Sequence, residues 1–193
     1  MQGSPDEMLR AARWLGGLRS RYDAIVAIAG NHDFDAQLRP DETRALFESN
    51  GITWLQDSAA SVNGLRFYGS PWQPWFYDWA FNFPREDLET GAVARATWAK
   101  IPDDTDVLIT HGPPHGILDK TFGGDDDRVG CPHLLAAIRE RPSIVAHVFG
   151  HIHEGYGELT AGGVHFVNAA TCDRPRYAPN QPPITFTVAR ATE

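Results

Sequence analysis

Cysteine is nearly absent from this chain, which has only Cys131 and Cys172 among its 193 residues. The two cysteines do not stand in a CxxC spacing, so the sequence shows neither a disulfide framework nor a thiolate site for zinc. Apolar runs long enough to cross a membrane are also missing, and the chain does not open with a basic segment followed by an apolar one. These absences favour a reducing compartment, and we expect a cytoplasmic protein.

Positive charge is scarce as well. Lysine and arginine number 17 against 25 aspartate and glutamate residues, which gives a formal net charge of −8 and a pI of about 5.4. A field of this sign repels a polyanion, so general binding to nucleic acid is excluded. A small phosphate ester stays compatible with the composition, because a bound metal ion reverses the charge of the field around it.

The patterns along the chain alternate between helices and strands. Ser4, Pro5 and Glu7 supply an N-cap, a first helical position and a capping box, which predict a helix that begins at residue 5. Asn63-Gly64 predicts the turn of a β-hairpin. Further helices are expected at residues 41–49, 88–99 and 132–139, and strands at residues 24–29, 53–56, 58–62, 65–68, 107–110, 144–149, 164–168 and 184–188. This mixture predicts one α/β domain over residues 1–193, built as a sandwich of layers.

Polar clusters that contain histidine follow three of the predicted strands. They are Asn31-His32-Asp33 after residues 24–29, His111 after residues 107–110, and His151 with His153 after residues 144–149. Because loops at the carboxyl ends of strands converge in an α/β sheet, we expect the three clusters to share one site. Imidazole nitrogen and amide oxygen are suitable ligands for manganese, iron or zinc. If the backbone of residues 150–153 stays extended, its two histidines point to opposite sides and serve two different ions.

Each of these motifs alone has an ordinary explanation. Asn31-His32 is a turn signal, His111 could be a capping or packed histidine, and His151 with His153 could serve hydrogen bonds only. Only the three motifs together favour a shared site. The remaining histidines are interpreted as structural or surface residues: His115, His133, His147 and His165, with His147 packed inside its strand.

Three tryptophans stand close together among prolines in residues 69–84, namely Trp72, Trp75 and Trp79. The prolines make a helix or a strand unfavourable there, so the segment is predicted to be an aromatic loop. The three rings could stack a nucleobase. Aromatic residues in a proline-rich loop more often cover the core, and core cover is the interpretation we favour.

The ordered motifs GNHD at residues 30–33, HGPP at 111–114 and GHIH at 150–153 resemble those of the calcineurin-like metallophosphoesterases. Flanking stretches such as GSPW, WAFN and THGPPHGILD are similar to the subgroup called metallophosphoesterase-domain-containing proteins, known from animal brain and many bacteria. The resemblance implies a layered αββα-type sandwich. It also implies a hydrolase that uses divalent metal ions (Mn, Fe or Zn) to cleave a small phosphodiester such as a nucleotide.

The resemblance further implies a role for each motif residue. In the family two metal ions lie side by side and clamp a phosphate, and a water or hydroxide between them attacks phosphorus. By position, the expected ligands of one metal are Asn31, His111 and His151, and His153 is expected to bind the other. His32 is expected to act as general acid for the leaving oxygen, or to stabilise charge on the phosphoryl group, while Asp33 orients its ring.

Two motifs of the family are missing from this sequence: an Asp-x-His at the end of the first strand, and a Gly-Asp whose aspartate bridges both metals. We therefore expect an N-terminally truncated chain, with the missing strand and motifs encoded in frame upstream. Such a chain is expected to hold at most one metal tightly, to hydrolyse phosphodiesters poorly, and to form homo-oligomers through an exposed sheet edge. The alternatives are a pseudoenzyme that binds a metal or nucleotide without catalysis, and a fragment that works only as an oligomer.

Overall fold

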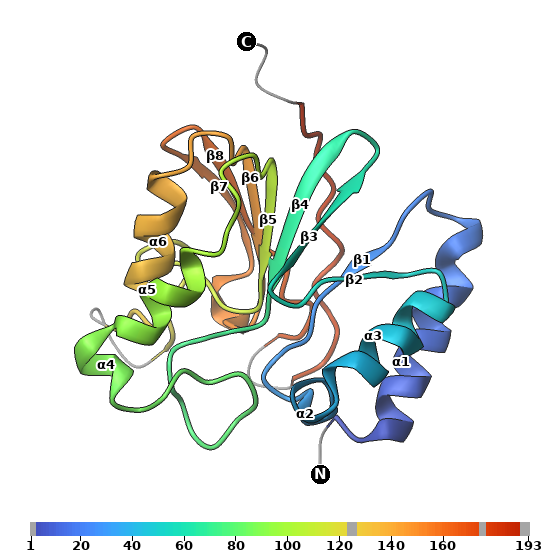
Figure 1. Ribbon diagram of the computed structural model, residues 1–193. Coiled ribbons are helices and arrows are strands. Elements are labelled where there is room, and N and C mark those ends of the chain that lie inside the picture. Colours follow the sequence, from blue (N-terminus) through green and yellow to red (C-terminus); the bar gives the residue numbers. More distant parts are fainter. Residues whose placement is uncertain (1–2, 123–126, 174–176, 190–193) are drawn as a thin grey trace.

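The computed structural model describes residues 3–122, 127–173 and 177–189, which form two β-sheets flanked by helices (Figure 1). Three helices cover one face of the larger sheet, and three others lie beside the smaller sheet. The first group consists of α4 (Asp87–Thr90), α5 (Ala92–Trp98) and α6 (Pro132–Arg139), and the second of α1 (Pro5–Gly17), α2 (Phe34–Leu38) and α3 (Pro40–Ser49). Two short 3₁₀ helices complete the list, η1 (Leu18–Ser20) and η2 (His153–Gly155).

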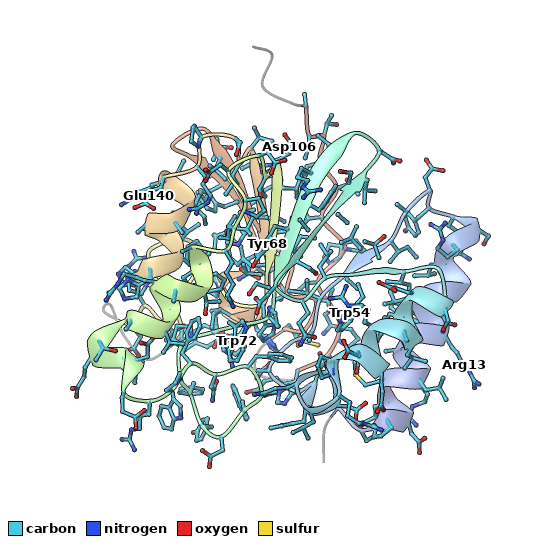
Figure 2. The ribbon with its side chains drawn as sticks, in the orientation of Figure 1. Arg13, Trp54, Tyr68, Trp72, Asp106 and Glu140 are labelled. Atoms are coloured by element: carbon cyan, nitrogen blue, oxygen red, sulfur yellow. The ribbon has the colours of Figure 1, made fainter. Side chains whose placement is uncertain are left out.

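The larger sheet has six strands in the order β3-β4-β5-β6-β8-β7. Their bounds are Ser58–Val62 for β3, Leu65–Ser70 for β4, Val107–Thr110 for β5, Ala146–Phe149 for β6, Gly157–Ala161 for β7 and Val164–Asn168 for β8. The four central strands β4, β5, β6 and β8 are parallel, and an antiparallel hairpin closes each side. In Figure 2, Asp106 before β5 lies at the upper end and Trp72 after β4 at the lower end. The parallel strands therefore all end at the lower edge.

The smaller sheet pairs β1 (Val26–Ala27) with β2 (Thr53–Trp54) in parallel. Beside α3 lies α1 (Figure 1), which begins with the predicted capping box: Ser4 N–H donates to Glu7 Oε2 at 2.9 Å, and Glu7 N–H donates to Ser4 Oγ at 3.4 Å. Met8 and Ala12 of α1 are buried against this sheet. The smaller sheet thus takes its apolar cover from helices on one side.

Two hydrophobic clusters form the core, one on each side of the molecule. Tyr68, near the larger sheet, belongs to the first, and Trp54, near α3, belongs to the second (Figure 2). Trp72 packs against both clusters, and its indole N–H donates to Asp57 Oδ2 at 2.8 Å. This one side chain therefore links the two halves of the core.

The two sheets meet where Gly69 of β4 faces the smaller sheet. A Cβ atom on Gly69 would lie 2.4 Å from Leu55 Cβ and 2.7 Å from Ile28 Cγ2, closer than side-chain atoms pack. The absence of a side chain at residue 69 therefore sets how closely the sheets approach each other.

Several predicted elements have the observed bounds. Strands 58–62, 107–110 and 164–168 and helix 132–139 are confirmed, and so is the hairpin turn, where Asn63 and Gly64 have φ of 50° and 82°. The predicted helix 88–99 is wrong as a single element. It breaks at Gly91, which has φ of 61° and no Cβ, because the ring of His133 fills the space beside it.

The predicted strand at residues 184–188 is also wrong. The burial of this segment does alternate, with Ile184, Phe186 and Val188 half-buried and the two threonines exposed, but no described strand pairs with it. The strand that the sequence analysis missed is β7, an edge strand that pairs with β8 through the turn at Gly162-Gly163. Alternation records which side chains face apolar neighbours, whereas a strand also needs a ladder partner.

None of the helices in the described residues is long and apolar enough to cross a membrane.

Replacement of Gly69 by alanine tests the contact between the sheets. We expect Gly69→Ala to lower the free energy of unfolding by about 1–3 kcal/mol, because the new methyl group forces Leu55 and Ile28 apart. Gly17→Ala is the control, since a Cβ there meets nothing within 4 Å and alanine favours the helix by up to about 1 kcal/mol. Chemical denaturation of both variants measures the difference, and equal stabilities contradict this account.

Candidate functional site

Two of the three histidine motifs lie on adjacent parallel strands. His111 follows β5 and His151 follows β6 by one residue, and the Gly150 N–H donates to the His111 carbonyl at 3.0 Å. This hydrogen bond continues the pairing of the strands past their ends. The two loops therefore leave the lower edge of the sheet side by side.

The third motif reaches this place from the smaller sheet. Asn31 is buried just beyond β1, and its side-chain Oδ1 lies 2.8 Å from His111 Nε2. The same Nε2 atom lies 3.1 Å from His151 Nδ1. The structure thus brings three of the four predicted metal ligands together, each from a different loop.

Gly30 makes room for this arrangement. A Cβ atom on Gly30 would lie 2.8 Å from His111 Cε1 and 2.9 Å from His111 Nδ1. Any side chain at residue 30 would therefore displace the ring of His111. Residue 30 is therefore a glycine because the ring of His111 packs closely against it. A turn-like sequence pattern does not distinguish this reason from a need for conformational freedom.

Asp33 does not make the contact that the sequence predicted for it. Its Oδ2 accepts the Gly30 N–H at 2.7 Å, and no hydrogen bond joins it to His32 among the described residues. The carboxylate turns back on its own loop because the Gly30 N–H, three residues earlier, is within its reach. Burial raises the pKa of Asp33, and the hydrogen bond from Gly30 opposes this rise. Asp33 holds the loop that carries Asn31.

His32 lies at the exposed rim of the site. Its ring centroid is 5.2 Å from that of Trp79, with the two planes inclined by 57°. The indole of Trp79 also stands 6.0 Å from His151, edge to face. The orientation of His32 therefore comes from an aromatic neighbour.

His153, the fourth predicted ligand, is near enough to His111 and His151 for its charge to lower the pKa of both rings. It begins η2, and its ring packs edge to face against Tyr177 at 5.5 Å. The condition of an extended backbone in GHIH is not met, because His151 has φ of 69°, in the left-handed region. The two histidines nevertheless point to different neighbours.

Burial governs the charge of the imidazoles. Together with repulsion from neighbouring histidines, burial lowers the pKa of His111 well below its ordinary value and that of His151 to about 4. Both rings are therefore neutral at pH 7 and can offer nitrogen lone pairs to a cation.

The three donor atoms fit a single divalent cation. Ligands about 2.1 Å from one ion and about 90° apart lie about 3 Å from each other. The separations of 2.8 Å and 3.1 Å around His111 Nε2 agree with this spacing. Within the described residues, histidine, cysteine, aspartate and glutamate alone form no group of three that could hold a metal.

Asn168 supports the site and was not singled out by the sequence analysis. It ends β8 and is fully buried, and its Nδ2 donates to the carbonyls of Ile152 at 2.8 Å and Leu118 at 3.2 Å. It thereby ties together the loops that follow β5 and β6. Its position at the carboxyl end of a predicted strand, the signal used for the three histidine motifs, could have found it.

His147 occupies the predicted packed position within β6 and is fully buried, with its ring against Phe149 and Phe166. Its Nε2 lies 2.8 Å from Thr110 Oγ1, which itself donates to the Gly112 carbonyl at 2.7 Å. Because the hydroxyl proton is used there, His147 Nε2 carries the hydrogen and donates. This chain of hydrogen bonds fixes the residues on both sides of His111.

The three tryptophans of the aromatic loop have different roles. Trp72 covers the core, as expected, and Trp75 lies beneath the Arg85 guanidinium, 4.9 Å from its ring centroid. Trp79 does not cover the core, because it is half-buried beside His32 and His151. Sequence alone does not show which of three neighbouring rings turns toward a site.

Comparisons with known proteins agree with this arrangement. Residues 5–155 match the family described as calcineurin-like phosphoesterase. The chain is 40% identical over 205 residues to metallophosphoesterase domain-containing protein 1 of Homo sapiens, covering 95% of this chain and 60% of that protein, with the same values for the Mus musculus protein. It is 34% identical over 200 residues to a UPF0046 protein of Caenorhabditis elegans, covering 98% of this chain and 65% of the relative.

The chain thus spans about 60–65% of the length of these curated relatives. A solved crystal structure matches with a TM-score of 0.60 and 19% identity, covering 86% of this chain and 63% of the other. That likeness shows a common fold, and the prediction of a layered α/β sandwich is confirmed.

Replacement of His147 by glutamine tests the charge state of this buried ring. The pKa of His147 is lowered from 6.5 to about 3, so below pH 6.5 the unfolded chain binds a proton that the folded chain does not. Stability is therefore lost as pH falls from 6.5 toward 3, at up to about 1.4 kcal/mol per pH unit. Glutamine keeps a donor near Thr110 but does not titrate. His147→Gln should therefore make the unfolding free energy less dependent on pH, by the contribution of about one bound proton. Unfolding curves of both proteins between pH 7 and 4.5 measure this dependence. If stability falls equally with pH in both proteins, the prediction is contradicted.

Proposed function

Because this chain belongs to the calcineurin-like phosphoesterase family, we propose that it is a metal-dependent hydrolase that cleaves a small phosphodiester of the nucleotide type. Membership confirms the resemblance predicted from the GNHD, HGPP and GHIH motifs. The observation that carries the proposal is the convergence of Asn31 Oδ1 and His151 Nδ1 on His111 Nε2. Three loops far apart in sequence supply neutral donor atoms at one place.

Asn31, His111 and His151 would hold a divalent cation such as manganese, iron or zinc. When bound there, the cation supplies positive charge for the phosphoryl group and lowers the pKa of a bound water. The chain itself fixes the place at which the cation would be held. The neutral rings leave the full charge of the cation uncancelled, which favours an anionic ester on a protein with a formal net charge of −8.

His32 is the proposed proton donor for the leaving oxygen. Its ring is exposed at the rim of the site, and Trp79, which contacts both His32 and His151, places it beside the three donors. A general acid of this kind contributes most when the leaving oxygen is strongly basic. In this proposal Asp33 acts on His32 only through the shape of the loop that both residues share.

The second candidate function is binding of a metal ion or a nucleotide without turnover. It is favoured by one observation: the three donor atoms that meet at His111 Nε2 all belong to uncharged side chains. Three neutral ligands suit one ion, and two adjacent cations without a carboxylate between them would repel each other. Metal stoichiometry and turnover distinguish the two functions.

Removal of one proposed ligand should reduce metal binding. We expect His111→Ala to weaken the binding of Mn²⁺ or Zn²⁺ by more than the about 10–100-fold that accompanies loss of an outer hydrogen-bond partner. Elemental analysis after dialysis and titration calorimetry measure the effect. His133→Ala is the matched control, because His133 lies on α6 beside Gly91. Equal metal content in the two variants overturns the assignment of ligands.

Replacement of His32 by alanine should affect substrates unequally. We expect His32→Ala to slow hydrolysis of an alkyl phosphodiester by about 100-fold or more, and hydrolysis of a nitrophenyl phosphodiester by less than about tenfold. The physical reason is that a nitrophenolate leaves without a proton. Steady-state rates of both esters with the metal-loaded protein test this, and equal slowing shows that His32 only binds or supports structure.

A further inference from the structure

Three aromatic side chains, Phe76, Tyr77 and Trp79, form a cluster beside the three-donor site. Their ring centroids lie 4.5 Å apart for Phe76 and Tyr77, 5.3 Å for Phe76 and Trp79, and 5.5 Å for Tyr77 and Trp79. The Trp79 ring in turn contacts His32 and His151. We name these three residues the aromatic cluster. Through Trp79, the cluster lies directly beside the proposed position of the phosphoryl group.

The aromatic cluster is exposed to an extent that packing does not explain. Phe76 is 49% exposed and Tyr77 is 63% exposed, whereas Phe81 and Phe83 in the same loop are buried. Phe81 and Phe83 thus already cover the core for this loop, and Phe76 and Tyr77 are not needed for that purpose. Adjacent exposed aromatic rings at the border of a site are a feature of surfaces that bind a partner or ligand.

Hydrogen bonds hold the loop in one shape before any ligand binds. Asn82 Nδ2 donates to the carbonyls of Tyr77 at 2.7 Å and Phe76 at 3.3 Å, and buried Gln73 donates to Asn82 Oδ1 at 3.0 Å. Tyr77 has φ of 50°, which a tyrosine adopts only when its surroundings enforce it. The exposed rings are therefore ordered, and a ligand that contacts them loses little affinity to the ordering of the loop.

The loop is also fixed to the proposed metal ligand. The Ala80 N–H donates to the Asn31 carbonyl at 3.0 Å, next to Trp79 in the chain. Phe81 N–H donates to Gln37 Oε1 at 2.8 Å and extends this attachment to α2. The distance between the aromatic cluster and the three donor atoms is thus set by backbone hydrogen bonds.

We propose that Phe76, Tyr77 and Trp79 bind the planar aromatic group of a phosphoester whose phosphoryl group lies at Asn31, His111 and His151. A purine base or an aryl group stacks on exposed aromatic faces without a requirement for particular hydrogen bonds. The exposed carboxylate of Asp78 lies within the same cluster and disfavours a second phosphate there. This inference rests on the proposed function and assigns to the site the class of ester that it prefers.

Binding of a nucleoside monophosphate and of inorganic phosphate separates the two claims. With the Mn²⁺-loaded chain, we expect calorimetry to give a Kd for adenosine monophosphate that is at least about tenfold lower than that for phosphate. Tyr77→Asn should remove most of this difference and leave the Kd for phosphate within about twofold. Trp79→Leu should also remove the difference, but because Trp79 contacts His32 and His151, only Tyr77→Asn is used to compare phosphate binding. Asparagine suits the backbone of residue 77, and its variant keeps the test valid if Trp79→Leu fails to fold.

Trp14→Leu is the control, because Trp14 is a tryptophan on α1 that is 67% exposed and absent from the aromatic cluster. It should retain both affinities and the quenching of tryptophan fluorescence by adenosine monophosphate, which Trp79→Leu should lose. Equal affinities of the starting protein for the two ligands overturn the inference and leave the proposed function standing. Unchanged affinities in both aromatic variants, or a parallel loss of phosphate binding in Tyr77→Asn, also overturn the inference. If the metal-loaded protein binds neither ligand, both proposals fail.

Discussion

The distance between the two sheets is the constraint on which the site depends. Asn31 arrives from the smaller sheet, whereas His111 and His151 arrive from the larger one, so their donor atoms meet only if the sheets pack at one fixed separation. Gly69 permits that separation by leaving space for Ile28 and Leu55. Trp72, which packs against both clusters of the core, maintains it from the other direction. Core packing and site geometry are therefore one property of this molecule.

The electrostatic state of the site follows from the same packing. Burial keeps the rings of His111 and His151 neutral, so the chain presents nitrogen lone pairs and an amide oxygen without a compensating negative charge. Most of the charge of a cation held there would remain available to an anionic ligand. In a chain with 25 acidic and 17 basic residues, a cation held in this small region would supply the positive charge that an anionic ligand needs.

Much of the site could be predicted from sequence, since residue type and position at a strand end determine it. Asn31, His111 and His151 each follow an apolar run. The paired parallel strands β5 and β6 bring His111 and His151 to one edge, whereas Asn31 arrives from the smaller sheet. The remaining features depend on tertiary contacts that leave no local pattern. Examples are the left-handed backbone of His151, the turn of Asp33 toward Gly30, and the contact of Trp79 with two histidines. The ring of His133, which lies far along the chain, likewise occupies the space that a side chain at residue 91 would need.

The missing side chain of Gly30 has a consequence for how the sequence can change over time. The volume that a Cβ atom at residue 30 would fill is already taken by the imidazole of His111, 81 positions later in the chain. The two positions therefore cannot vary independently. A relative that acquires a side chain at the first position must accept a smaller residue at the second, and with it a different set of donor atoms. A side chain at residue 30 should thus appear only together with a substitution of the histidine, whereas the histidine can change while the glycine is kept.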